Sequence, residues 1–229
     1  MLIHGLQKMT LLDYPQHVAC TVFFGGCDFR CPYCHNFELV DGTMPPVMED
    51  EEFFSFLKTR QGLLDGVAIT GGEPLLNKNL PEFIRKIRRL GFSVKLDTNG
   101  NHPEALKALL DEGLIDYVAM DIKNSLPKYG QTIGLDNFDT SNIEKSIRLI
   151  MDSNIDYEFR TTVVKELHDD SSFEAIGKLI SGAKAYYLQA FVSRDTVPDK
   201  NLSSPDAEDM YRYLEIVRAN VPAALIRGM

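Results

Sequence analysis

Residues 25–36 read "GGCDFRCPYCHN" and contain three of the four cysteines of this 229-residue chain. Three interpretations are open. Cys31 and Cys34 form a C-x-x-C pair, as in dithiol redox proteins, and His35 extends it to C-x-x-C-H, the attachment signal of a c-type haem. Cys27 instead completes C-x3-C-x2-C, in which three thiolates hold an iron–sulfur cluster and leave one iron unligated. The rest of the chain decides among them.

The composition, 44% hydrophobic and 25% charged, is that of a globular protein. Lys and Arg total 24 against 33 Asp and Glu, and the resulting net charge of −9 disfavours nucleic acid or an anionic membrane as partner. The N-terminus lacks a signal-peptide pattern, and no stretch reaches the ~18 apolar residues of a membrane span. We therefore expect a cytoplasmic protein whose reduced cysteines bind metal or act in catalysis, which disfavours the haem.

Six strand-like runs alternate with amphipathic helical patterns along the chain. The runs cover residues 18–24, 66–70, 92–98, 116–122, 156–164 and 185–192. Several are almost continuously apolar, as parallel strands buried on both faces are. Ser141 and Ser171, each three residues before a glutamate, predict the starts of two later helices. The alternation predicts an α/β fold, a partial, open (βα)6 barrel in a single domain over residues 1–229, with an N-terminal extension over about 1–17.

Polar groups follow the strands at their carboxyl ends, where such a barrel gathers its functional residues. The cysteine loop follows the first strand, "GGEP" (71–74) the second, "DTNG" (97–100) the third and "DIK" (121–123) the fourth. Taken singly, each motif is an ordinary turn or a surface ion pair. Together they favour one functional site at the carboxyl ends of the strands. A redox dithiol would need few of these groups.

The number of cysteines bears on the metal. Three ligands suit a [4Fe–4S] cube with one open iron, whereas a closed zinc site needs four. Cys20 lies inside the first strand-like run, and we expect it to be a buried core thiol. A dithiol protein would leave Cys27 without a role. A non-enzymatic zinc or redox-sensing module remains the alternative from a different functional class.

With these motifs in this order, the chain resembles the radical S-adenosylmethionine (SAM) enzymes. It most resembles the glycyl-radical-enzyme activating proteins of the anaerobic ribonucleoside-triphosphate reductase type, which are similar to pyruvate formate-lyase activating enzyme. The likeness runs from "GLQKMTLLDYP" to "YYLQAF". The cysteine motif, preceded by "FFGG" and followed by His-Asn, is its most specific part. A histidine that pyruvate formate-lyase activase carries after its sixth strand is absent here.

The resemblance implies a [4Fe–4S] cluster on Cys27, Cys31 and Cys34, with SAM chelating the fourth iron and a monovalent cation as a further candidate cofactor. The SAM contacts that it implies are Tyr33 against the adenine, Gly71, Gly72 and Glu73 at the methionyl ammonium, and Asp97, Thr98, Asp121 and Lys123 near the carboxylate and ribose. It also implies catalytic positions at Asp13, Arg160 and Lys123, of which Asp13 and Arg160 face the partner's glycine loop.

The implied reaction is reductive cleavage of SAM to a 5′-deoxyadenosyl radical, which takes a Cα hydrogen from a glycine of a partner glycyl-radical enzyme. We expect that partner to be an anaerobic ribonucleotide reductase. Because four cysteines cannot supply further clusters, electrons are expected from an external flavodoxin- or ferredoxin-like donor. The alternative within the same fold is a radical SAM enzyme acting on a small molecule, such as a 7-carboxy-7-deazaguanine synthase.

Overall fold

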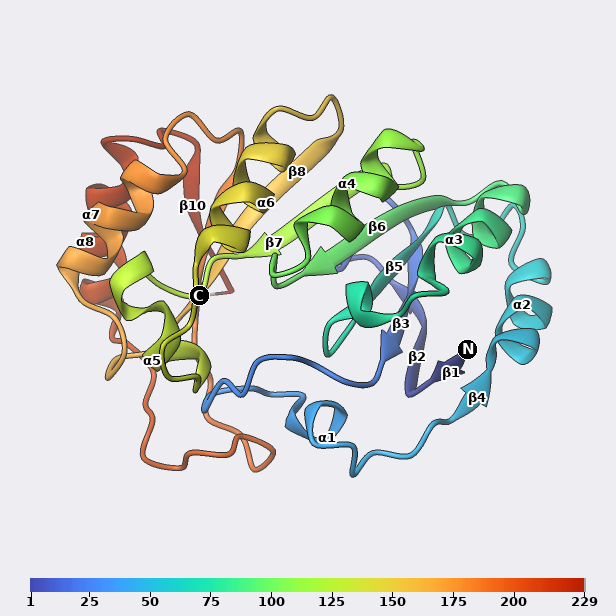
Figure 1. Cartoon of the computed structure of the whole chain (residues 1–229), viewed down its shortest axis with the longest axis horizontal. Helices are drawn as coiled ribbons and strands as arrows, with labels where there is room; N and C mark the ends of the chain where they lie inside the picture. The colour runs from blue at the N-terminus through green and yellow to red at the C-terminus, as the bar shows by residue number, and fades with distance from the viewer. Residues whose placement is uncertain (229) are drawn as a thin grey trace.

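The computed structural model describes residues 1–228 and is built around one curved sheet (Figure 1). The sheet has eight strands in the order β10-β9-β8-β7-β6-β5-β3-β2. The strands are β2 (Gly5–Thr10), β3 (Ala19–Phe24), β5 (Gly66–Gly71), β6 (Ser93–Thr98), β7 (Tyr117–Asp121), β8 (Asp156–Val163), β9 (Tyr186–Ala190) and β10 (Ala224–Arg227). Neighbouring strands pair in parallel from β3 to β10, and β2 alone pairs antiparallel, with β3.

All six predicted strands are present, within one or two residues of the predicted bounds. The open, partial barrel is confirmed, because β2 and β10 lie at opposite ends of the sheet order. It has one more parallel strand than the six expected, since β10 pairs with β9. The N-terminal extension is also structured: it supplies β2, and β1 (Leu2–Ile3) pairs antiparallel with β4 (Met48–Glu49).

The described part of the chain also contains eight helices and two 3-10 turns. They are α1 (Phe37–Val40), α2 (Asp50–Lys58), α3 (Leu80–Arg89), α4 (Pro103–Asp111), α5 (Tyr129–Ile133), α6 (Ser141–Met151), α7 (Asp170–Leu179) and α8 (Ala207–Arg218), with 3-10 turns η1 (Pro74–Leu76) and η2 (Leu126–Lys128). Figure 1 shows α3, α4, α6 and α7 along the outside of the strands. Among the residues described, no helix is both long and apolar enough to cross a membrane.

The hydrophobic core lies between these helices and the outward-facing side chains of the parallel strands. Val67, Val94 and Val118 are fully buried there, as are Phe83 and Ile84 of α3. Alternate residues of the same strands therefore point to the inner, concave side of the sheet. The inner side carries the polar residues that form the site described below.

The two helix starts predicted from serines are wrong in detail. Helix α7 is capped by Asp169, whose side chain accepts a hydrogen bond from the Ser172 backbone N–H at 2.9 Å, and Ser172 completes the capping box. Ser171 therefore lies inside the helix, because the chain offers a carboxylate cap two residues earlier. Helix α6 follows Thr140 and has no side-chain cap, so Ser141 is its first residue.

Candidate active site

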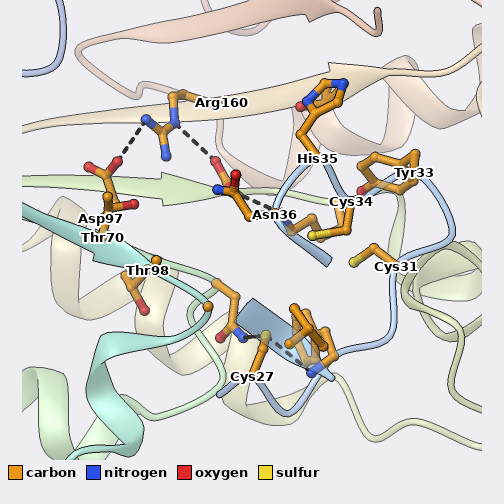
Figure 2. Close-up of a pocket in the computed structure, with 18 of the residues that line it drawn as sticks. Cys27, Cys31, Tyr33, Cys34, His35, Asn36, Thr70, Asp97, Thr98 and Arg160 are labelled. Atoms are coloured by element: carbon orange, nitrogen blue, oxygen red, sulfur yellow. Dashed lines mark hydrogen bonds and ion pairs between the residues drawn. The ribbon is translucent and has the colours of Figure 1, made fainter. Parts of the chain in front are cut away.

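A cavity of about 480 Å³ lies at the carboxyl ends of the strands (Figure 2). Its lining includes every predicted site residue except Glu73: Asp13, Cys27, Cys31, Tyr33, Cys34, Gly71, Gly72, Asp97, Thr98, Asp121, Lys123 and Arg160. Thr162 and Gln189, at the ends of β8 and β9, line it as well. The strand-end motifs thus meet around one space, as parallel strands in a single sheet require.

The cysteine loop (residues 25–36) leaves β3 through two glycines. The Gly25 N–H donates a hydrogen bond to His4 Nδ1 at 3.0 Å, and the Gly26 N–H donates to the Leu39 carbonyl at 2.8 Å. Gly26 has φ +88°, a left-handed conformation that glycine adopts without steric cost. His4 of the N-terminal extension therefore helps to fix the point at which the loop begins.

The "GGEP" segment lies directly against the start of this loop. The Gly72 N–H donates to the Phe24 carbonyl at 2.9 Å, and the Glu73 N–H donates to the Gly26 carbonyl at 2.7 Å. Such close backbone approach leaves little space for side chains at residues 71 and 72. The glycines therefore have a local structural role in addition to any contact with a ligand.

Three thiols face the cavity. Figure 2 shows Cys27, Cys31 and Cys34 directed toward the same space, and the Phe29 N–H donates to Cys27 Sγ at 3.4 Å. Burial raises the pKa of Cys27 to about 12 and that of Cys31 to about 11, so both thiols are protonated at neutral pH in the metal-free chain. Binding of a metal to them releases these protons. In residues 1–228, no three side chains among His, Cys, Asp and Glu are arranged to hold a single metal ion. The donor set fits a cluster, in which each thiolate binds a different iron.

Cys20, the fourth cysteine, and His35, the histidine of the C-x-x-C-H pattern, have different surroundings. Cys20 is fully buried in β3, as predicted for a core thiol. His35 Nε2–H donates to the Val192 carbonyl at 2.6 Å, and its ring stacks on Phe191 with 5.5 Å between ring centroids. His35 therefore fastens the end of the cysteine loop to the segment after β9, a role that the sequence did not indicate.

A row of alternating charges crosses the inner side of β6, β7 and β8. Lys95 pairs with Asp97, Arg160 Nη1 contacts Asp97 at 3.3 Å and Arg160 Nε donates to Asp121 at 2.9 Å, while Lys123 Nζ donates to Asp121 at 2.9 Å. Burial alone would raise the pKa of Asp121, but Arg160 and Lys123 hold it far below its usual value. Three cations thus face two carboxylates, and the row favours an anionic ligand group.

Glu73 is fully buried and its carboxylate lies away from the cavity lining. One oxygen accepts from the Leu75 N–H at 3.1 Å and the Thr98 hydroxyl at 2.9 Å, and the other accepts from the Asn99 N–H at 2.7 Å. Burial raises the pKa of Glu73 to about 7 although these donors lower it. The observed role of Glu73 is to join two strand-end loops, and its contact with a SAM ammonium remains a prediction.

Two further residues complete the cavity wall. Tyr33 is 4% exposed, and its buried hydroxyl has no hydrogen-bond partner in the described part of the chain. A buried hydroxyl without a partner is costly, so a ligand that accepts from it would be favoured. Asp13 comes from the loop between β2 and β3, and its carboxylate accepts from the Thr21 hydroxyl at 2.6 Å.

Sequence reasoning gave no site role to Phe29, Asn36, Val40 and Thr70, which also line the cavity. Thr70 directly precedes Gly71 on the inner side of β5, so its place at a strand end was a usable signal. Asn36 is the last residue of the cysteine loop, and Val40 is the last residue of α1, the short segment that follows it. Nothing in their spacing indicates that this segment folds back over the cavity.

The model of the Radical SAM superfamily matches residues 21–179. A Methanocaldococcus jannaschii protein with the provisional name glycyl-radical enzyme activating enzyme MJ1227 is 32% identical, over 99% of this chain and 95% of its own length. The 7-carboxy-7-deazaguanine synthase of Methanopyrus kandleri is 28% identical, over 87% of this chain and 80% of its own length. The structure of Streptococcus suis SuiB bound to its precursor peptide SuiA superposes with a TM-score of 0.70 at 13% identity, covering 91% of this chain and 48% of SuiB.

Proposed function

This chain belongs to the radical SAM superfamily, and we propose that it is an activase that generates a radical on a glycine of a partner enzyme. The observation that carries the proposal is the three-cysteine loop at a cavity that also contains Asp13 and Arg160. Similarity to the M. jannaschii protein over almost the entire chain supports the activase assignment. The family implies a [4Fe–4S] cluster and SAM as cofactors.

Cys27, Cys31 and Cys34 would hold the cluster, and their common orientation in Figure 2 fits that role. When bound and reduced by one electron, the cluster and SAM supply cleavage of the sulfonium C–S bond, which yields methionine and a 5′-deoxyadenosyl radical. The protein binds and orients the reactants and excludes water from the cavity. An external flavodoxin- or ferredoxin-like protein supplies the electron in this proposal.

In this proposal, residues from several separate loops bind different parts of SAM. Gly71 and Gly72 expose backbone to the cavity, where only a residue without Cβ permits close approach. Lys123 and Arg160 attract the carboxylate of SAM, and Tyr33 offers its unpartnered hydroxyl. Lys95, Arg160 and Lys123 already neutralise Asp97 and Asp121. We therefore leave a monovalent cation out of the proposal.

In this proposal the substrate glycine binds beside Asp13 and Arg160, which both line the cavity. Leu11 and Leu12, which directly precede Asp13, are 68% and 89% exposed. Their exposure is fixed by local structure, because the Thr10 hydroxyl accepts from the N–H groups of Leu12 and Asp13 at 3.2 Å each. Two exposed leucines next to the site favour a protein rather than a small molecule as substrate. An anaerobic ribonucleotide reductase is the partner that we propose.

A second candidate function is supported by the similarity to the M. kandleri 7-carboxy-7-deazaguanine synthase. Both functions share the cluster, SAM and the same cavity. They differ in the group that loses the hydrogen, which is a glycine of a protein in one case and a small molecule in the other.

The test is anaerobic reconstitution of the chain with iron and sulfide, followed by addition of reductant, SAM and a candidate glycyl-radical enzyme. We expect 5′-deoxyadenosine in the solution and a glycine-centred radical signal on the partner by electron paramagnetic resonance (EPR). A cluster-loaded protein that leaves SAM intact would contradict the radical SAM assignment of activity. Cleavage of SAM without a radical on any candidate partner would favour the small-molecule alternative.

A further inference from the structure

Asp28, the residue after the first cysteine of the loop, accepts three hydrogen bonds from one neighbouring segment. Asn99 Nδ2 donates to Asp28 Oδ1 at 2.8 Å, while Asn101 Nδ2 and His102 Nε2 donate to Asp28 Oδ2 at 2.6 and 3.0 Å. All three donors belong to the turn between β6 and α4. Neither the fold nor the binding of SAM described above accounts for this convergence on a single carboxylate.

The donors are themselves held in place. The Asn99 N–H donates to Glu73 at 2.7 Å, and the Asn101 N–H donates to Asn99 Oδ1 at 2.9 Å. Asn142 of α6 donates to the Asn101 carbonyl at 3.2 Å. A side chain whose hydrogen-bond donors are themselves held by other residues is held in one orientation. The Asp28 carboxylate is therefore fixed in orientation relative to the cysteine loop.

The carboxylate is ionised and close to a predicted cluster ligand. The Asn99, Asn101 and His102 side chains all donate to the two oxygens of Asp28, and such donors stabilise the charged form of a carboxylate. Asp28 Oδ1 lies 3.9 Å from Cys27 Sγ. Lys123 also lines the cavity, but its ammonium is paired with the Asp121 carboxylate at 2.9 Å. Solvent screens the field of a partly buried negative charge only weakly, so the Asp28 carboxylate acts on the neighbouring sulfur.

We propose that the negative charge of Asp28 makes the cluster on Cys27, Cys31 and Cys34 harder to reduce. This inference rests on the cluster-binding part of the proposed function. One-electron reduction adds a negative charge to the cluster, and a fixed carboxylate beside one of its ligands opposes that charge. Net charge and hydrogen bonds near the sulfurs set the potentials of iron–sulfur clusters. The turn at residues 99–102 holds the carboxylate in this position.

The test compares midpoint potentials of the reconstituted wild-type chain and Asp28→Asn, measured anaerobically by redox titration and followed by EPR. Asparagine has the shape of aspartate. It can also keep the hydrogen bonds, because the Asn101 amide can turn and His102 can present its unprotonated nitrogen. Asp28→Ser is a second neutral variant. Asp136→Asn, an exposed acidic residue in the loop after α5, is the matched control for net charge.

We expect both neutral Asp28 variants to shift the potential to a less negative value, with the Asp136 variant at the wild-type potential. An unchanged potential in cluster-loaded Asp28→Asn and Asp28→Ser would overturn this inference and leave the proposed function intact. Folded Asp28 variants that bind no iron would also overturn it, because the carboxylate would then serve only to hold the loop. A wild-type chain that forms no cluster would overturn the proposed function itself, and this inference with it.

Discussion

Gly72 lies so close to Gly26 that a Cβ atom on Gly72 would be 2.0 Å from the Gly26 carbonyl oxygen. The obstacle is backbone, which cannot turn aside as a flexible side chain can. The two strand-end loops that define the cavity are thus in direct backbone contact, and the position of the first cysteine depends on the absence of a side chain at residue 72.

Replacing Gly72 with alanine should therefore displace the cysteine loop. We expect the iron bound per chain after reconstitution to fall several-fold, and the stability of the metal-free chain to fall by about 1–3 kcal/mol, the usual cost of overpacking. Iron content and thermal unfolding check this. Gly177→Ala in α7 is the control, because its Cβ would meet no atom closer than 3.4 Å. Wild-type iron content in Gly72→Ala would contradict this account of the contact.

Arg160→Lys tests the row of charges. Arg160 contacts Asp97 and Asp121 through different nitrogens, whereas a lysine ammonium cannot match the geometry of the guanidinium fork at both carboxylates. We expect the affinity of the cluster-loaded enzyme for SAM to fall by roughly tenfold, about 1.4 kcal/mol, in equilibrium dialysis. Arg212→Lys is a matched control, because Arg212 also bridges two aspartates, Asp170 and Asp209, on the exposed surface of α8. Equal losses in the two variants would refute a specific role for Arg160.

Glu73 gives the metal-free chain a distinctive pH dependence. The pKa of Glu73 is raised from 4.5 to about 7 in the folded state, so the folded chain binds more protons than the unfolded chain between these values. The contribution of Glu73 to stability is thus greatest below pH 4.5, declines as the pH rises through 7 and is constant above. Between pH 5 and pH 8 the decline is roughly 2.5 kcal/mol.

Urea unfolding of the wild type and Glu73→Gln at pH 5 and pH 8 measures this contribution. The glutamine has no charge to titrate, so the free energy of unfolding of Glu73→Gln should increase relative to that of the wild type as the pH rises. Groups that Glu73 does not influence contribute equally to both chains and cancel in the difference. The His102 imidazole is an exception, because the Glu73 carboxylate helps to raise its pKa. Parallel pH profiles for the two chains would show that Glu73 is ionised in the fold throughout this range.

The four cysteines should separate into two classes. Cys31→Ala removes a predicted ligand, and we expect it to abolish the visible absorption of the reconstituted cluster and the cleavage of SAM. Cys20→Ala should keep both, and should cost only about 1 kcal/mol of stability through lost packing, because Cys20 is buried in the core. Visible absorption spectra and iron analysis distinguish the two variants. Loss of iron in Cys20→Ala would instead point to a fourth cysteine ligand.

Much of the fold could be predicted because its signals are local. Six strand-like runs, several of them almost continuously apolar, and the helical periodicity of residues such as Phe83 and Ile84 predict the order of strands and helices. The strands that were missed are short or lie at an edge: β10 has four residues, and β2 leaves Gln7, Lys8 and Met9 exposed. Their place in the sheet depends on pairing with distant strands rather than on their own pattern.

The position of a residue in the cavity could be predicted where a local motif at a strand end contains it, as with the three cysteines and Lys123. It was not predictable where groups from several loops meet. The three donors to Asp28 lie about 70 residues away from it in the sequence, at separations of 71 to 74 residues. The buried position of Glu73 likewise depends on contacts with Thr98 and Asn99. Such contacts follow from the fold and cannot be inferred from the spacing of the residues.

The most direct test of the proposed activity is to follow the hydrogen itself. A candidate glycyl-radical enzyme is labelled with deuterium at the Cα of its glycines and incubated anaerobically with the reduced, cluster-loaded chain and SAM. The 5′-deoxyadenosine produced is then analysed by mass spectrometry. The proposal predicts 5′-deoxyadenosine carrying one deuterium atom, together with a glycine-centred radical on the partner. Release of 5′-deoxyadenosine without deuterium, from an enzyme that cleaves SAM in the presence of a folded partner, would contradict it.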